Sequence, residues 1–136
     1  MSYYVKTRLM KLIKTFKFKA IKDNRGKLTP INFDKIIKHK IHRAFFINLK
    51  KNTERGKHAH KKGYQIFICL KGTINFKIIN KFKSFNLKLL ESSLHGYIVP
   101  SRHWVSFSSK NNNSQLIVLC TTKFDKSDYI HDIKKL

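Results

Sequence analysis

Two histidines separated by one residue, His58 and His60, carry the strongest chemical signal in the sequence. Side chains at alternate positions of a β-strand point to the same face, so a strand through residues 58–60 would present both imidazoles together. Imidazole titrates near neutral pH, and in its neutral form it also binds transition metals. Such a pair facing into a small barrel can therefore either transfer protons or ligate a metal ion.

The residues that follow this pair distinguish between the two chemistries. Their spacing resembles the first metal-binding motif of the cupins, in which a glutamate and then a glycine turn follow the second histidine. Gln65 occupies the position of that glutamate, and Gly72 keeps the turn. The carboxylate ligand is lost, which favours a site without a metal. His103, three residues after Pro100, could supply a third imidazole as in the second cupin motif, so a three-histidine metal site stays open.

The histidine segment resembles one group of cupins in particular, the nucleoside-diphosphate-sugar 3,4-ketoisomerases (WxcM-like cupins). Its sequence RGKHAHKKGYQIFICLKGTINFKI is similar to the group's R-G-x-H-A-H-K-K block, apolar strand and glycine turn. Three other segments resemble further motifs of the group: DNRGKL at 23–28, RAFFI at 43–47 and LIVLCTTKFDKSDYI at 116–130. The last of these is similar to a closing strand followed by Y-D-E-x-D-Y-I. The resemblance covers residues 21–133, nearly the whole chain.

This resemblance implies a jelly-roll homodimer that acts, without a cofactor or a metal, on a thymidine-diphosphate (dTDP)-linked 4-keto-6-deoxyhexose. It matches His60 to the group's principal acid/base and His58 to its assisting histidine. Moving a ketone from C4 to C3 requires loss of the C3 proton, an enediolate and protonation of C4. A histidine suits these proton transfers, and a fixed cation or donor would stabilise the enediolate. We therefore predict a dTDP-sugar 3,4-ketoisomerase that serves deoxy- or amino-sugar synthesis for surface glycans.

Several other residues are predicted to contact the substrate: Arg25, Arg55, Tyr64, His103 and Trp104. Arg55 precedes the histidine pair on the same segment and could contact a sugar oxygen or a phosphate. Arg25 lies in the D-x-R-G segment, which is also ordinary turn sequence. Where the group has a pair of tyrosines, this chain has Phe45-Phe46. A phenol is therefore missing near the substrate, and Tyr64 could restore the hydroxyl.

The segment after the late proline also differs from the group. The group usually has Trp followed by His, whereas this chain has His103 followed by Trp104. One of the two should then face the other side of the strand, unless a bulge shifts the register. Trp104 would either stack on a base or sugar or belong to the core.

The elements that must position these residues are predicted to be β-strands. Short runs of β-branched and aromatic residues alternate with polar turns, at a spacing typical of sandwiches and barrels. Residues 73–78 and 84–89 alternate between polar and apolar, which indicates strands with one buried face. Residues 66–70 and 116–120 are continuously apolar, as expected for strands between two packed sheets. We predict an all-β cupin-type jelly roll.

A length of 136 residues suffices for one domain with a hydrophobic core. We divide the chain into an N-terminal extension, residues 1–18, and a jelly-roll domain, residues 19–136. The extension could contribute a strand to a partner subunit, because open edge strands of a small β-protein need covering. Helix signals are confined to residues 9–16 and 129–135.

The formal net charge of +23 would ordinarily indicate nucleic-acid binding. However, 25 of the 30 basic residues are lysines, whereas nucleic-acid readers favour the bidentate guanidinium of arginine. Lys, Asn, Ile and Phe all have AT-rich codons, so genome composition explains the bias, and we expect no nucleic-acid partner. No apolar run is long enough for a membrane span. Cys69 and Cys120 lie within apolar runs, which is typical of buried free thiols in a cytoplasmic protein.

Two other functions stay open. A sugar-nucleotide 3,5-epimerase would share the fold type and would also abstract a proton beside a ketone. A non-catalytic cupin that binds a nucleotide sugar or a metal is the second alternative, because Phe45-Phe46 replaces residues expected near the substrate.

Overall fold

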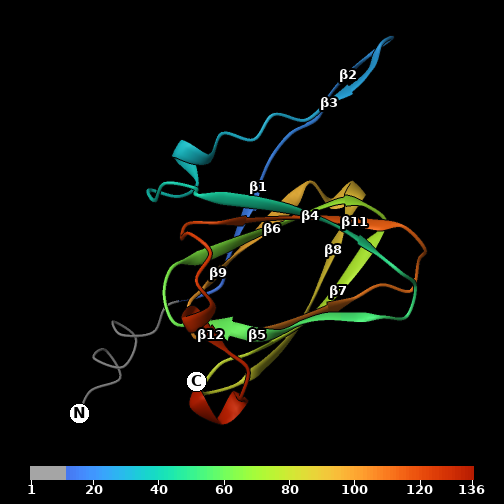
Figure 1. Cartoon of the computed structure of the whole chain (residues 1–136). Helices are drawn as coiled ribbons and strands as arrows, with labels where there is room; N and C mark the ends of the chain where they lie inside the picture. Colours follow the sequence, from blue (N-terminus) through green and yellow to red (C-terminus); the bar gives the residue numbers. More distant parts are fainter. Residues whose placement is uncertain (1–11) are drawn as a thin grey trace.

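A computed structural model describes residues 12–136, and these residues form two antiparallel sheets that face each other (Figure 1). The first sheet has the strand order β1-β9-β6-β11-β4, and the second has the order β12-β5-β10-β7-β8. The strands of the first sheet are β1 (Lys14–Lys17), β4 (Arg43–Leu49), β6 (Tyr64–Lys71), β9 (His95–Pro100) and β11 (Ser114–Cys120). Those of the second are β5 (Glu54–His60), β7 (Thr73–Ile79), β8 (Ser84–Leu90), β10 (Trp104–Ser108) and β12 (Tyr129–Ile130).

The remaining described elements are short. Strands β2 (Ile21–Asp23) and β3 (Gly26–Leu28) form a separate hairpin. Single 3₁₀ turns lie in the connections and at the C-terminus: η1 (Phe33–Lys35), η2 (Glu91–Ser93), η3 (Lys126–Asp128) and η4 (Ile133–Lys135). The predicted all-β jelly roll is confirmed. Of the helix signal at 9–16, residues 9–11 lie outside the described part, and the rest is not helical but leads into strand β1. The signal at 129–135 is wrong for an α-helix, because it covers strand β12 and the single 3₁₀ turn η4.

The main core lies between the two sheets, and the alternation of the sequence explains which side chains fill it. In β7, Ile74, Phe76 and Ile78 are buried, whereas the intervening Lys77 is exposed. The ring of Phe76 packs edge-to-face on Phe67 of β6, with ring centroids 5.3 Å apart. Interdigitation of aromatic and branched side chains from both sheets therefore produces one closed core.

Strand β6 is apolar on both faces because each face meets a different layer. Phe67 and Cys69 point into the core between the sheets. Ile66 and Ile68 point outward and join a second cluster with Ile98 of β9. Partly buried residues outside the sheet cover this second cluster: Phe18, Ile31, Phe33, Ile36, Ile37 and Ile41. The continuously apolar sequence of β6 thus reflects a third layer over the first sheet.

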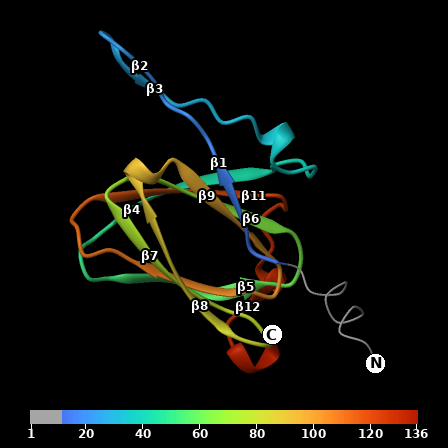
Figure 2. The same cartoon turned by 180° about the vertical axis from the view of Figure 1, so that it is seen from behind.

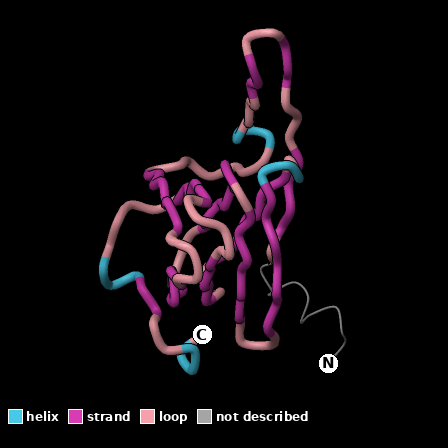
Figure 3. The backbone as a smooth tube through the Cα atoms, turned by 90° about the vertical axis from the view of Figure 1, so that its right-hand side faces the viewer, coloured by secondary structure: helices cyan, strands magenta, loops and turns pink. Residues whose placement is uncertain are grey.

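The β2–β3 hairpin projects away from both sheets as an arm, which the views from opposite sides and from the edge all show (Figures 1, 2 and 3). Asp23 pairs with Gly26 at its tip, so Arg25 lies in the turn. Ile21 and Leu28 on this arm are 56% and 65% exposed. The arm therefore leaves apolar side chains uncovered within one chain.

Strand β1 adds to the edge of the first sheet by pairing with β9 of the same chain. It belongs to the predicted N-terminal extension, of which residues 1–11 lie outside the described part. Exchange of this strand between subunits stays a prediction. No helix within residues 12–136 combines the length and the apolar character needed to cross a membrane.

Candidate active site

A β-bulge in strand β5 brings Arg55, His58 and His60 to one face. Val105 of β10 pairs with His58, but the next residue, Ser106, pairs with Gly56, so Lys57 is the extra residue. Simple alternation would put Arg55 on the opposite face from the histidines, and the extra residue reverses that order. All three side chains line one cavity between the sheets.

The bulge explains why a glycine precedes Lys57. Gly56 has a φ of 85° and Lys57 a φ of 63°, and only glycine adopts the first without strain. A Cβ atom on Gly56 would lie 2.6 Å from the carbonyl oxygen of Val105. The glycine of the R-G-x-H-x-H sequence therefore permits the bulge that places the side chains of Arg55, His58 and His60 in one cavity.

The cavity has a volume of about 360 Å³, and the core residues Phe67 and Phe107 form part of its lining. Its lining residues are Arg43, Phe45, Phe46, Ile47, Arg55, Gly56, His58, His60, Gln65, Phe67, Val105, Phe107, Val118 and Tyr129. None of these carries a carboxylate. The ionisable groups that it presents are thus two imidazoles, two guanidiniums and one phenol, a set suited to an anionic ligand and to proton transfer.

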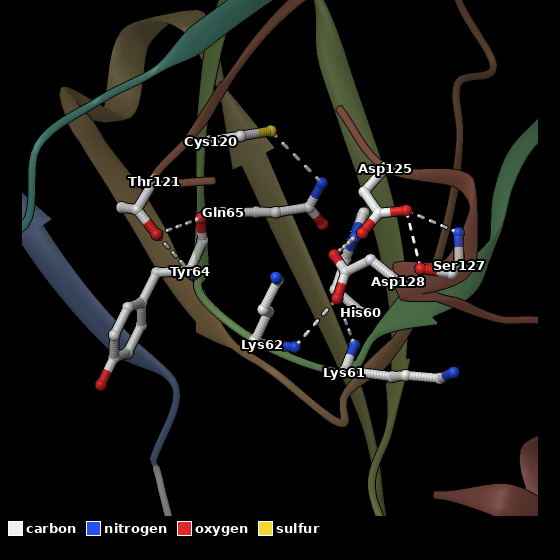
Figure 4. Close-up of polar contacts among 10 residues, drawn as sticks. All are labelled: His60, Lys61, Lys62, Tyr64, Gln65, Cys120, Thr121, Asp125, Ser127 and Asp128. Atoms are coloured by element: carbon white, nitrogen blue, oxygen red, sulfur yellow. Dashed lines mark hydrogen bonds and ion pairs between the residues drawn. The ribbon is translucent and has the colours of Figure 1, made fainter. Parts of the chain in front are cut away.

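His60 is held by a buried carboxylate from the other end of the chain. Its Nδ1 lies 2.8 Å from Oδ2 of Asp128, whose side chain is only 4% exposed (Figure 4). The other oxygen of Asp128 accepts hydrogen bonds of 3.1 Å from the backbone amides of Lys61 and Lys62. A carboxylate on Nδ1 makes that nitrogen the donor and leaves Nε2 as the acceptor. Nε2 is buried and has no hydrogen-bond partner among the described residues.

His58 is oriented by its own strand. Its Nδ1 lies 3.0 Å from the carbonyl oxygen of Gly56, which can only accept, so Nδ1 carries the proton. Burial lowers the pKa of His58, and the neighbouring His60 and His131 lower it further, against a smaller opposite effect of the Gly56 carbonyl. The ring centroids of His58 and His60 are 5.1 Å apart. Two imidazoles with fixed tautomers therefore stand side by side.

Tyr129 closes the second side of the histidine pair. It follows Asp128 directly and pairs with His60 where β12 joins β5. Its ring centroid is 4.7 Å from each of the His58 and His60 rings. On its other side it stacks on His131, with centroids 6.0 Å apart and planes at 11°. The ring is therefore enclosed by imidazoles on both sides.

Arg43 supplies a second cation to the cavity besides Arg55. Its guanidinium carbon lies 5.2 Å from the ring centroid of Phe45 and 5.0 Å from that of Phe124. Aromatic faces attract a guanidinium and leave its N–H groups available for an acceptor. Gln65, which stands where a metal-binding cupin has glutamate, lines the cavity and places its amide nitrogen 3.8 Å from Sγ of Cys120.

Tyr64 does not reach this cavity. Neighbouring residues of a strand point to opposite faces, so Gln65 faces inward and Tyr64 faces outward (Figure 4). The Tyr64 ring packs on His39, with centroids 5.0 Å apart, in the layer outside the first sheet. The expectation that Tyr64 replaces the phenol lost at Phe45-Phe46 is therefore corrected, and Tyr129 is the phenol at the cavity.

His103 and Trp104 also lie outside the cavity lining. His103 is 6% exposed, with Nδ1 3.0 Å from the Ser101 carbonyl and Nε2 3.3 Å from the amide nitrogen of Asn80. Trp104 pairs with Ile79 and its indole nitrogen is buried without a partner among the described residues. Within residues 12–136, no three His, Cys, Asp or Glu side chains are grouped so as to hold a metal ion.

Arg25 lies at the tip of the arm, outside the cavity of its own chain. Its guanidinium makes a 2.6 Å ion pair with Asp23, and its side chain is 85% exposed. The structure thus brings His58, His60 and Arg55 together and leaves Arg25, Tyr64, His103 and Trp104 elsewhere.

Three residues at the site escaped the sequence analysis: Arg43, Asp128 and Tyr129. All three lie in the segments that resemble the ketoisomerase motifs, RAFFI and KFDKSDYI. The signal was present, but only the fold shows that residue 128 meets residue 60.

The fold is a cupin-type jelly roll, and a pair of histidines lines a cavity between its two sheets. The family model described as "FdtA: WxcM-like, C-terminal" matches residues 11–136, and the chain belongs to that family.

Several related proteins share this fold. The TDP-4-oxo-6-deoxy-alpha-D-glucose-3,4-oxoisomerase of Aneurinibacillus thermoaerophilus is 33% identical over 118 residues, which are 86% of this chain and 84% of that protein. The QdtA sugar 3,4-ketoisomerase of Thermoanaerobacterium thermosaccharolyticum, solved in complex with TDP, is 29% identical, with a TM-score of 0.81 over 90% of this chain and 93% of that one. The WlaRB TDP-quinovose 3,4-ketoisomerase of Campylobacter jejuni is 25% identical, with a TM-score of 0.82 over 93% and 97%. Each of these three proteins is named as a sugar 3,4-ketoisomerase or 3,4-oxoisomerase.

Proposed function

We propose that this protein is a dTDP-sugar 3,4-ketoisomerase that converts dTDP-4-keto-6-deoxyglucose into a dTDP-3-keto-6-deoxyhexose. The observation that carries the proposal is the His60–Asp128 pair, in which Nδ1 is occupied and Nε2 is left to accept a proton beside the cavity. One related enzyme is named for a TDP-linked 4-oxo-6-deoxyglucose, and another is solved in complex with TDP. The product would serve deoxy- or amino-sugar synthesis for surface glycans.

In this mechanism His60 moves the carbon-bound proton. Nε2 takes the proton from C3, the resulting imidazolium exchanges its proton with solvent, and Nε2 then protonates C4; Asp128 stabilises the imidazolium formed in between. The reaction transfers hydrogen within one sugar, so it consumes no oxidant or reductant. We therefore propose that neither a cofactor nor a metal takes part.

The cations of the cavity suit the charges of such a substrate. Arg43 and Arg55 line it from different strands, and no carboxylate among the lining residues neutralises them. A guanidinium binds phosphate oxygens bidentately and also stabilises an enediolate. We propose that these two arginines bind the diphosphate and the developing oxyanion, and that His58 assists His60.

We also propose that the protein acts as a homodimer in the cytoplasm. The arm leaves Ile21 and Leu28 exposed, and Phe46 of the edge strand β4 is 71% exposed, so a second copy would cover apolar surface. Arg25 lies beyond its own cavity, so its predicted contact with substrate would come from Arg25 of the partner subunit. The two cysteines are buried free thiols, which fits a reducing compartment.

The test is incubation with dTDP-4-keto-6-deoxyglucose in deuterated water, followed by proton NMR. A 3-keto product with deuterium at C4 is the expected result, and the H4–H5 coupling constant of the product formed in ordinary water gives the configuration at C4. The His60→Asn variant should form no product yet keep its affinity for TDP. Deuterium at C5 would indicate a 3,5-epimerase instead. Unchanged substrate from a wild type that binds TDP would contradict catalysis and favour a binding cupin.

A further inference from the structure

The end of the molecule opposite the arm is formed by two turns. One is the turn between β7 and β8, residues 80–83, and the other is the C-terminal turn η4; the edge view shows both at this end (Figure 3). Residues 102 and 103 connect them. Nε2 of His103 lies 3.3 Å from the amide nitrogen of Asn80, and the Arg102 guanidinium donates to the carbonyl oxygen of Lys135 at 3.3 Å. The two turns and Arg102 therefore form one surface, called the basic end below.

The turn at 80–83 is rigid, yet it exposes an aromatic ring. Oδ1 of Asn80 accepts hydrogen bonds from the amides of Phe82 and Lys83, at 2.8 and 2.9 Å. The Asn80 amide donates to the Lys83 carbonyl oxygen at 3.0 Å. Turns favour small polar residues and glycine, and Phe82 is 56% exposed, so its ring adds uncovered apolar area that the turn does not need. A ring held on a fixed turn loses little conformational entropy when it binds a partner.

Cations surround the apolar side chains of the basic end. A second apolar residue, Ile133 in η4, is 42% exposed. The exposed cations of this surface are Lys81, Lys83, Arg102, Lys134 and Lys135. None of them forms an ion pair with a carboxylate within residues 12–136. Asp132, whose side chain caps η4 by accepting from the Lys134 amide, is the only acidic residue in 130–136, and residues 79–85 contain none. The surface thus carries excess positive charge around two apolar side chains.

This combination matches the interface of an anionic lipid bilayer. Apolar side chains enter the boundary between headgroups and acyl chains, while lysines and arginines stay at the lipid phosphates. A folded acidic protein would need a shaped pocket for the Phe82 ring, whereas a bilayer accepts a projecting ring without one. The arm lies at the other end, so a dimer that covers the arm leaves the basic end free (Figures 1 and 3).

We propose that the basic end binds the surface of anionic phospholipid membranes. Phe82 and Ile133 enter the interface, and the five cations contact lipid phosphates. The protein then binds the bilayer peripherally, through a surface separate from the cavity that holds His58 and His60. This inference does not depend on the proposed ketoisomerase activity.

The experiment is cosedimentation of the full-length chain with vesicles. Two compositions are compared: phosphatidylcholine alone, and phosphatidylcholine with phosphatidylglycerol at a molar ratio of about 2:1. We expect the partition coefficient to be at least about tenfold higher for the anionic vesicles and to fall as salt is added. Phe82→Ser should lower it by about tenfold, because the ring no longer inserts. Phe82→Trp should match or exceed wild type, since tryptophan favours the membrane–water interface.

Two double variants separate the basic end from the charge of the whole chain. Lys81→Gln/Lys83→Gln should lower the partition coefficient by about 10- to 30-fold. Lys77→Gln/Lys88→Gln removes the same charge from exposed positions on β7 and β8, away from the turn, and should stay within about threefold of wild type. Thermal unfolding followed by circular dichroism verifies that each variant is folded.

Three results would overturn the proposal: equal partitioning into both kinds of vesicle, wild-type binding by Phe82→Ser, or equal losses in the two double variants. Polyglutamate provides a soluble anionic competitor. If it binds as tightly as the anionic vesicles, and Phe82→Ser binds it equally well, then the partner is an acidic protein surface and not a membrane.

Discussion

Nδ1 of His60 lies 2.8 Å from Oδ2 of Asp128, although 68 residues separate them in the chain. Asp128 is in turn fixed by the amides of Lys61 and Lys62, directly after His60. The imidazole is thus held by a carboxylate that is itself held by the backbone of the same strand end. Such a double anchor fixes both the tautomer and the ring plane.

Replacing Asp128 by asparagine should remove most of the activity. An amide cannot stabilise the imidazolium as a carboxylate does, and it permits the wrong tautomer. We expect kcat for Asp128→Asn to fall by about 10²-fold or more, with the Kd for TDP within about threefold of wild type. Steady-state kinetics and calorimetry measure the two quantities.

Asp125→Asn is the matched control for that variant. Asp125 is an exposed residue whose side chain caps η3 by accepting from the Ser127 amide, and asparagine caps equally well. Its kcat should stay within about threefold of wild type. Equal losses in both variants would attribute the effect to the turn and not to the His60–Asp128 pair.

The bulge in β5 should be sensitive to any side chain at Gly56. A Cβ atom there meets the Val105 carbonyl at 2.6 Å, and the φ of 85° is strained for alanine. We expect Gly56→Ala to lower the free energy of unfolding by about 2–4 kcal/mol, measured by urea denaturation. Lys57→Gly changes the neighbouring left-handed residue without a clash, and it should stay within about 1 kcal/mol of wild type. A larger loss in Lys57→Gly than in Gly56→Ala would contradict this description of the bulge.

Stability should decrease on acidification through the buried histidines. Burial is the largest cause that lowers the pKa of both His58 and His103 in the folded state. In the unfolded chain their pKa is about 6.5, so below that pH the unfolded state binds more protons. Their contribution is complete above the unfolded-state pKa and is lost as the pH falls through the lowered folded-state pKa. The free energy of unfolding measured across this range should depend less steeply on pH in a His58→Asn/His103→Asn variant, and an unchanged slope would disprove the assignment.

The arm provides a test of the proposed homodimer. Wild type should sediment with about twice the 16.1 kDa mass of one chain. Leu28→Lys introduces a charge at an apolar position of the arm and should shift the protein to the monomer. Lys22→Ala, on the opposite strand of the same hairpin, should leave the dimer intact. A wild type that sediments as a monomer would contradict the proposed assembly.

Local patterns in the sequence were enough to predict the fold class and half of the site. The period-two alternation of β7 and β8 and the glycine turn at Gly72 gave the jelly roll. The spacing of His58 and His60 placed both on one face, and the structure agrees. Arg55 could not be placed by alternation alone, because the bulge at Lys57 depends on pairing with β10.

Contacts between distant segments could not be predicted in this way. Asp128 reaches His60 only because β12 pairs with β5, a contact that no local pattern encodes. The same reason explains the choice between the two phenols. Tyr64 is close to the histidines in sequence but faces the outer layer, whereas Tyr129 is far in sequence and adjacent in space.

Strand β12 is only two residues long, yet it attaches Asp128 and Tyr129 to strand β5, which carries the histidine pair. A ladder this short opens by local fluctuation at a free energy below that of global unfolding. Each opening would release the carboxylate behind His60 and the phenol in front of it together, while both sheets stay folded. Active and inactive molecules would then have the same two folded sheets and would differ only in whether the last dozen residues are docked on strand β5. Amide hydrogen exchange at the C-terminus would therefore report the fraction of competent enzyme, which warming would reduce before the sandwich melts.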